Sequence, residues 1–120
     1  MRNSSGYGRV KIDKEGYVTD IVEDKDATDE EKKIREINSG IYCFRSGSLW
    51  DALRLITNNN AQGEYYLTDV ISLLAKNGEK IHSDTSPDSR ELVGINTLEQ
   101  LEEARKILQQ KKTTGVKMLQ

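Results

Sequence analysis

Hydrogen-bonding side chains are concentrated in residues 58–69, which read Asn-Asn-Asn-Ala-Gln-Gly-Glu-Tyr-Tyr-Leu-Thr-Asp. They lie between two apolar patterns of helical period, and their asparagines and glycine favour turns. A loop of such particular composition between two regular elements is typical of a functional surface. The stretch indicates no reaction by itself, so its meaning depends on the rest of the chain.

Three further polar stretches contain residue types that suit ligand binding, at residues 6–9, 36–40 and 94–96. Each also has an ordinary structural interpretation. The first two are common turn or bulge sequences, and the third is typical of the start of a helix. Glu23, at the end of a predicted strand, is by itself more often a solvated carboxylate than a ligand. Only the joint order of these stretches favours a functional interpretation.

The elements that position these stretches are predicted from hydrophobic periodicity. Alternation predicts a hairpin, with strands at residues 6–13 and 17–23 joined by a Lys-Glu-Gly turn. Further strands are expected at residues 36–44, 80–83 and 91–95, the first of them central in a sheet. Because helical patterns alternate with these strands, the sequence favours an α/β fold with the hairpin at the edge of the sheet.

Four helices are predicted. The first and the last begin with capping boxes, formed by Thr28 with Glu31 and by Thr97 with Gln100. The expected caps of the middle two are Ser46 or Ser48, and Thr68 or Asp69. The third helix is expected to end at residues 77–78 and the last at Gly115. The apolar faces expected in the core are Leu49, Trp50, Leu53 and Ile56; Val70, Ile71, Leu73 and Leu74; and Leu98, Leu101, Ala104, Ile107 and Leu108.

Composition restricts the classes of function. The chain has 120 residues, of which 35% are hydrophobic and 32% charged, which fits one folded domain with charged outer faces. A net charge of -2 provides no basic field, so nucleic acid and anionic membranes are not expected partners. No apolar segment follows residues 1–5, and a cytoplasmic location is expected. The single cysteine, Cys43, lies in an apolar run and is expected to be a buried structural thiol.

Five blocks, taken in order and with their spacing, resemble a known family. They are residues 6–10, 21–27, 36–41, 58–69 and 94–96. The family is the bacterial bifunctional N-acetylglucosamine-1-phosphate uridylyltransferase and glucosamine-1-phosphate acetyltransferase, and the match is to the second half of its uridylyltransferase domain. The resemblance implies part of a Rossmann-like nucleotide-diphospho-sugar transferase fold, a three-layer α/β/α domain with a mixed sheet and an N-terminal hairpin.

The resemblance also implies roles for individual residues. Gly8 would present its backbone amide to the sugar, and Glu23 would accept hydrogen bonds from sugar hydroxyls. Asn38 would suit a sugar that bears an N-acetyl group. Asn96 is placed at the same site, where its side-chain oxygen would bind Mg²⁺. Three further residues would lie near the sugar: Glu64, Tyr65 and Thr68.

In this family N-acetylglucosamine 1-phosphate attacks the α-phosphate of UTP, which gives pyrophosphate and the peptidoglycan precursor UDP-N-acetylglucosamine. The family's triphosphate loop, uracil-recognising residues and aspartate ligand of Mg²⁺ all precede the matched region, and only residues 1–5 precede Gly6 here. We therefore expect residues 1–112 to be the sugar-binding half of a nucleotidyltransferase domain that is inactive alone. Residues 113–120 are expected to begin the linker to an acetyltransferase domain that the chain lacks.

Two alternatives remain open at this point. The chain would otherwise be a non-catalytic sugar-binding or assembly module that keeps the fold, or a fragment of a related sugar nucleotidyltransferase with another base or sugar. Magnesium-dependent turnover of UTP after addition of a nucleotide-binding half distinguishes an enzyme half from a module. Because half a domain exposes a sheet edge and an apolar face, self-association or pairing with a complementing nucleotide-binding half is also expected.

Overall fold

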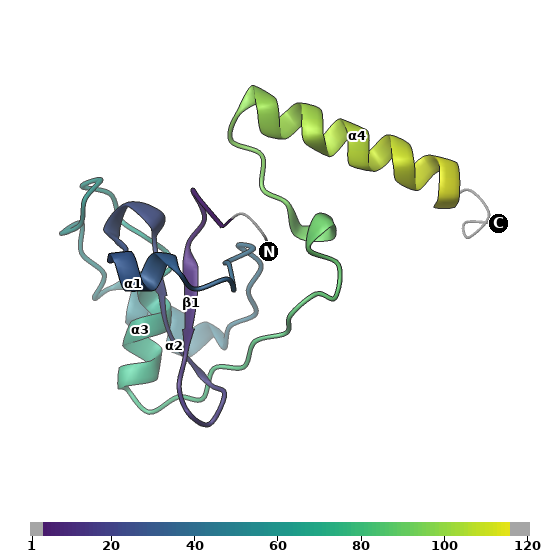
Figure 1. Cartoon of the computed structure of the whole chain (residues 1–120). Helices are drawn as coiled ribbons and strands as arrows, with labels where there is room; N and C mark the ends of the chain where they lie inside the picture. Colours follow the sequence, from purple (N-terminus) through teal and green to yellow (C-terminus); the bar gives the residue numbers. More distant parts are fainter. Residues whose placement is uncertain (1–3, 116–120) are drawn as a thin grey trace. The chain divides into compact units, whose positions relative to one another are not determined.

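The computed structural model describes residues 4–115, which belong to two compact units, Met1–Asp84 and Thr85–Gln120. The first unit is a mixture of α and β structure with one small antiparallel sheet (Figure 1). The elements of the first unit are β1 (Arg9–Ile12), β2 (Val18–Val22), the 3₁₀ helix η1 (Asp24–Asp26), α1 (Asp29–Lys32), α2 (Ser46–Leu53) and α3 (Asp69–Lys76). The elements of the second unit are the 3₁₀ helix η2 (Ser89–Leu92) and α4 (Leu98–Gly115).

The predicted N-terminal hairpin is confirmed. β1 and β2 pair in antiparallel register, with Val10 opposite Ile21. The turn between them is organised by Asp13, whose Oδ1 accepts hydrogen bonds from the backbone N–H groups of Glu15 (2.9 Å) and Tyr17 (3.0 Å). Local side-chain chemistry of this kind can be predicted from sequence, because all the partners lie within a few residues.

The prediction of a central strand at residues 36–44 is wrong for most of its length. One antiparallel bridge forms, between Arg9 and Ile37. Beyond it the side chain of Asn38 accepts the N–H of Gly40 at 3.0 Å, and the hydroxyl of Ser39 accepts the next N–H at 3.3 Å. Because these local bonds replace ladder bonds and Gly40 has a φ of +80°, the chain turns after a single bridge.

The two other predicted strands are also not formed. Residues 80–83 have no strand structure, although the carbonyl of Ile81 accepts the N–H of Val18 at 2.8 Å. Part of the strand expected at residues 91–95 is replaced by η2, which begins after Asp88, whose side chain accepts the N–H of Arg90. A short apolar run forms a strand only where a neighbouring strand takes its hydrogen bonds.

Both predicted capping boxes are confirmed. Thr28 and Glu31 exchange side-chain and backbone bonds at the start of α1. At the start of α4 the Gln100 N–H donates to Thr97 Oγ1, and Gln100 Oε1 accepts from the Thr97 N–H, both at 3.1 Å. These reciprocal bonds satisfy the first unpaired N–H groups of each helix.

The middle two helices begin without side-chain caps. Arg45 is the N-cap of α2 and Thr68 that of α3, and neither side chain bonds the helix start. The prediction that Ser46 or Ser48 caps α2 is therefore wrong, since both are helical residues. α3 ends as predicted at residues 77–78: Gly78 has a φ of +82°, and the two N–H groups after the cap bond back to the last turn.

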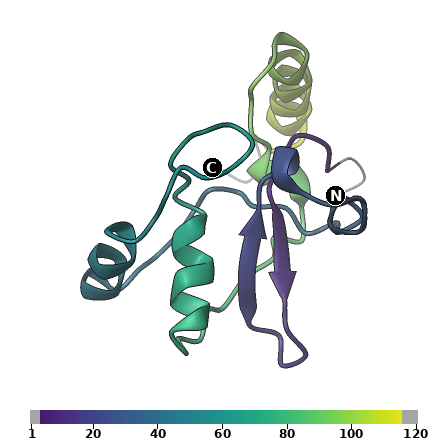
Figure 2. The ribbon, with the colours of Figure 1, turned by 90° about the vertical axis from the view of Figure 1, so that its left-hand side faces the viewer.

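The core of the first unit consists of two small buried clusters. Figure 2 shows α3 running beside the hairpin, and their contact buries the first cluster, Val18, Ile21 and Ile71. The second lies between α2 and α3 and consists of Ala52, Val70 and Leu74. Phe44 and Ile81 pack against both clusters. Residues 42–44 therefore contribute to the core although they form no strand.

Several residues predicted to be buried are exposed. Trp50 is 61% exposed. The face of α2 that packs is Leu49, Ala52 and Leu53, followed by Ile56 just after the helix, and Trp50 is turned about 100° from Leu49 around the helix. Cys43 is exposed because side chains alternate along this extended segment, so that Tyr42 and Phe44 face the core.

The apolar stripe of α4 is also only partly buried. Leu98, Leu101 and Leu108 are 84%, 45% and 60% exposed, whereas Ala104 and Ile107 are half-buried. In the described part of the second unit, η2 is the only other regular element, and it is too short to cover an 18-residue helix. Residues 116–120, which include most of the predicted linker, lie outside the described residues. The predicted domain boundary at residue 113 stays a prediction.

Candidate functional site

Three of the predicted site residues come together at one end of the hairpin. Gly8 immediately precedes β1 and Glu23 immediately follows β2, and antiparallel pairing brings these positions side by side. Asn38 joins them because its N–H donates to the carbonyl of Gly8 at 2.8 Å. A β-carbon at position 8 would lie 3.5 Å from Asn38 Cβ and 3.6 Å from Glu23 Oε2. Both side chains therefore lie directly beside the backbone of Gly8.

Thr68 belongs to the same group. Its hydroxyl donates to Glu23 Oε1 at 3.0 Å, across 45 residues of sequence, and its side chain is buried. This bond explains why Thr68 stands at the cap position of α3 without capping it. One oxygen of the Glu23 carboxylate is therefore held by the protein, and the other lies beside Gly8.

Tyr42 completes the group and was missed by sequence reasoning. Its hydroxyl donates to Asn38 Oδ1 at 2.7 Å. Burial raises the pKa of the Tyr42 phenol, against the lowering effect of the hydrogen bond with Asn38, and the negative charge of Glu23 also raises it, so the phenol stays protonated as a donor. The signal that could have identified it is the alternation of Tyr42, Cys43 and Phe44, which predicts a tyrosine facing inward beside Asn38. The residues Gly8, Glu23, Asn38, Tyr42 and Thr68 are referred to below as the hairpin-end cluster.

The asparagine-rich loop leads to this cluster and is organised by Asn60. Asn60 Oδ1 accepts the N–H groups of Gln62 and Glu64, at 3.1 and 3.2 Å. The N–H of Ala61 donates to Asp26 Oδ1 at 2.7 Å, which ties the loop to η1, just after Glu23 in the chain. The structure thus places Thr68 in the cluster. The two other predicted near-site residues, Glu64 and Tyr65, lie exposed on the loop that leads to it.

An ion pair between the buried Arg9 and the half-buried Asp24 lies next to Gly8 and Glu23 in the chain. The Arg9 guanidinium donates to Asp24 Oδ1 at 2.7 Å and to the carbonyls of Tyr7 and Lys32, and its side chain is 3% exposed. The hydrogen bond from Arg9 holds the pKa of the Asp24 carboxyl below its usual value, against the opposing effect of burial. The pair fixes the backbone on both sides of Gly8 and Glu23.

Asn96, the fourth predicted site residue, belongs to the second unit. Its backbone N–H donates to Gln100 Oε1 at 2.6 Å, beside the capping box of α4, and the residue is exposed. Its predicted association with Gly8, Glu23 and Asn38 therefore stays a prediction. Within residues 4–115 no group of three or more His, Cys, Asp or Glu side chains is arranged to hold a metal ion.

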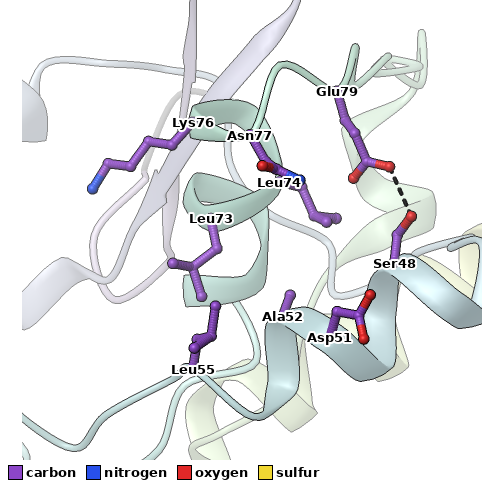
Figure 3. Close-up of a pocket in the computed structure, with 9 residues that line it drawn as sticks. All are labelled: Ser48, Asp51, Ala52, Leu55, Leu73, Leu74, Lys76, Asn77 and Glu79. Carbon is purple, nitrogen blue, oxygen red and sulfur yellow. Dashed lines mark hydrogen bonds between the residues drawn. The ribbon is translucent and has the colours of Figure 1, made fainter.

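A separate hollow lies between α2 and α3 and contains none of the hairpin-end residues (Figure 3). Its apolar lining includes Leu73 and Leu74 of α3 and Leu55 just after α2, and Ser48 Oγ donates to Glu79 Oε1 at 2.7 Å along its edge. These contacts join the two helices to the segment after α3.

No helix in the described part of the chain has the length and apolar character needed to cross a membrane.

Residues 1–89 match the family model described as Nucleotidyl transferase, and the chain belongs to this family. Among its relatives, the bifunctional protein GlmU of Geobacillus sp. (strain WCH70) is 50% identical over 109 residues, which cover 91% of this chain and 24% of that protein. GlmU of Syntrophomonas wolfei is 49% identical over 112 residues, or 93% of this chain and 25% of that protein. GlmU of Thermoanaerobacter pseudethanolicus is 51% identical over 111 residues, or 92% of this chain and 24% of that protein.

The chain thus spans about a quarter of the length of the curated relatives that it matches. The similarity extends over nearly the whole chain, as the five sequence blocks predicted. The resemblance inferred from those blocks is confirmed.

Proposed function

We propose that the hairpin-end cluster binds the N-acetylglucosamine moiety in a uridylyltransferase that converts UTP and N-acetylglucosamine 1-phosphate into UDP-N-acetylglucosamine and pyrophosphate. The observation that carries the proposal is the convergence of Gly8, Glu23 and Asn38 from three separate segments, with Thr68 bonded to Glu23 at 3.0 Å. The membership of the nucleotidyl transferase family and the similarity to GlmU proteins support it.

The chemistry of the cluster suits a sugar. The Glu23 carboxylate is an acceptor, and because Thr68 holds one of its oxygens, the other is available for sugar hydroxyls. Hydrogen bonds from hydroxyls to a carboxylate are charge-assisted and stronger than neutral ones. The protein contributes positioning, which is the main requirement in the transfer of a nucleotidyl group to a sugar phosphate.

We also propose that the side-chain oxygen of Asn96 binds Mg²⁺. An amide oxygen is a hard ligand of the kind that Mg²⁺ prefers, and the ion usually completes its octahedron with water and substrate phosphates. Asn96 would thus hold one position of the ion. When bound, Mg²⁺ neutralises charge on the phosphates during transfer.

On this proposal the chain is the sugar-binding half of a larger Rossmann-like domain with three α/β/α layers. Turnover of UTP then requires a complementing nucleotide-binding half, either in the same molecule or as a partner. The second candidate function is a non-catalytic sugar-binding module with the same site. For such a module, adding the nucleotide-binding half would not restore turnover of UTP.

The binding proposal is tested by titrating the ¹⁵N-labelled chain with UDP-N-acetylglucosamine and Mg²⁺ and recording two-dimensional NMR spectra. We expect shifts localised to the backbone signals of Gly8, Glu23, Asn38 and Asn96. Glu23→Gln should weaken binding by roughly tenfold, because a charge-assisted hydrogen bond is lost. Glu15→Gln, in the exposed hairpin turn, is the matched control and should bind normally. A dispersed spectrum that the ligand leaves unchanged would contradict the proposal.

A further inference from the structure

The orientation of the Asn38 amide is determined by two donors on the same atom. Tyr42 O–H donates to Asn38 Oδ1 at 2.7 Å, and the backbone N–H of Gly40 donates to it at 3.0 Å. A tyrosine hydroxyl alone would not decide the orientation, because it is also able to accept a hydrogen bond from an NH₂ group. The Gly40 N–H only donates, so the atom that it faces must be the amide oxygen. The NH₂ group of Asn38 therefore lies on the other branch of the amide.

We propose that Tyr42 is a positioning residue that makes this site selective for a sugar bearing an acetamido group. It does so by holding Asn38 with its NH₂ group available as a donor to the acetyl carbonyl. The inference rests on the proposed function and adds to it a residue that, together with the Gly40 N–H, holds the amide that contacts the sugar.

Tyr42 is well placed to hold the amide rigidly. Its ring packs on Phe44 with 5.5 Å between centroids and contacts the buried cluster of Val18, Ile21 and Ile71. The position of the Tyr42 hydroxyl is therefore fixed, because packing in the core restricts the rotamer of the side chain. A positioning bond from such a residue costs little further conformational entropy.

The hydrogen-bonding capacities in the cluster are matched to an acetamido sugar. Glu23 is acceptor-only and its free oxygen suits a hydroxyl that donates. With Oδ1 occupied, Asn38 is left with donors, which suit an acceptor such as an amide carbonyl. Glucose carries a hydroxyl in place of the acetamido group and does not extend a carbonyl to this position. The cluster should therefore distinguish UDP-N-acetylglucosamine from UDP-glucose.

The experiment compares the affinities of the full chain for these two nucleotide sugars by calorimetry or NMR titration. The wild type should prefer UDP-N-acetylglucosamine. Tyr42→Phe removes only the hydroxyl and should reduce that preference by roughly fivefold, with the affinity for UDP-glucose unchanged within about twofold. Asn38→Asp keeps an acceptor for Tyr42 and Gly40 but replaces the NH₂ group with oxygen, and should abolish the preference. If the role of Tyr42 were purely structural, Tyr42→Phe would lower the affinities for both nucleotide sugars equally and leave the ratio of the two affinities unchanged.

The outcomes separate the inference from the proposed function. If the wild type binds neither nucleotide sugar, the proposed function fails and the inference fails with it. If the wild type prefers UDP-N-acetylglucosamine and Tyr42→Phe keeps the full preference, only the role of Tyr42 is overturned.

If Tyr42→Phe does not fold, the wild-type spectrum still tests the contact of Asn38 on which the inference depends. The side-chain NH₂ signals of Asn38 should shift with UDP-N-acetylglucosamine and not with UDP-glucose. Equal shifts with the two ligands would overturn the inference.

Discussion

Gly8 occupies a position where Ile21 leaves little room for a side chain. A β-carbon there would lie 3.3 Å from Ile21 Cγ2 and in ordinary contact with Asn38 and Glu23. We expect Gly8→Ala to lower the free energy of unfolding by about 1 kcal/mol because Ile21 must shift, and to weaken sugar binding because the methyl group lies beside the two cluster side chains. Gly47→Ala is the control, since a β-carbon at Gly47, within α2, meets nothing within 4 Å and should stabilise by about 0.5 kcal/mol. Equal effects of the two substitutions in urea unfolding would contradict this account.

The phenol of Tyr42 predicts a pH dependence of stability. Burial raises the pKa of Tyr42 above its ordinary value of 10.0, so the folded chain keeps this proton at a pH where the unfolded chain loses it. The stabilisation is therefore complete below about pH 10 and decreases as the pH rises toward the folded pKa. Urea unfolding between about pH 8 and pH 11 should show a steeper loss for the wild type than for Tyr42→Phe. Tyr65→Phe, at an exposed position, should retain the wild-type slope.

Sequence reasoning identified Gly8, Glu23 and Asn38 as one group, and the structure brings them together. The resemblance to a known family implied this group; the hairpin accounts only for Gly8 and Glu23, which flank its two strands. Tyr42 was missed because it lies in a run of apolar residues, where a tyrosine usually belongs to the core. It does belong to the core, and its hydroxyl alone reaches the cluster.

At the scale of elements, the threonines that precede α3 and α4 make different hydrogen bonds. Thr97 caps α4, whereas Thr68 gives its hydroxyl to Glu23. Thr97→Val should destabilise the start of α4 by about 1 kcal/mol, seen as faster hydrogen exchange there, and leave sugar-induced shifts at Gly8 and Asn38 unchanged without Mg²⁺. Thr68→Val should leave α3 intact and weaken sugar binding by roughly fivefold, because Glu23 loses its orienting donor. The reverse pattern would show that Thr68 is a cap.

The predicted elements succeeded where their determinants are local. The hairpin turn at Asp13 and the capping boxes at Thr28 and Thr97 depend on partners within four residues, and all three are found. The strand predicted at residues 36–44 depended on apolar content, and it failed because Asn38 and Ser39 bond their own backbone beside Gly40. Hydrophobicity predicts that such a segment packs, but not which groups take its hydrogen bonds.

At the scale of the whole molecule, the burial is concentrated in the first unit. All six buried hydrophobic residues of the described chain lie between positions 18 and 74, in the two clusters around α3. Fully burying such a side chain contributes roughly 1.5–3 kcal/mol relative to exposure. The unit Met1–Asp84 therefore contains all the buried hydrophobic residues of the described chain, together with the whole hairpin-end cluster.

This division predicts that sugar binding depends on the first unit and that the effect of Mg²⁺ depends on the second. A chain that ends at Asp84 should keep the dispersed spectrum of the first unit and its sugar-induced shifts at Gly8 and Asn38, because every contact of the cluster lies before that residue. It should lose any strengthening of binding by Mg²⁺, since Asn96 is absent. Asn96→Ala in the full chain should abolish the same Mg²⁺ effect while leaving metal-free binding unchanged, and Asn77→Ala, just after α3, is the control. If Asn96→Ala retained the full Mg²⁺ effect, the proposed role of Asn96 would be wrong; if the shorter chain failed to fold, the first unit would depend on residues 85–120.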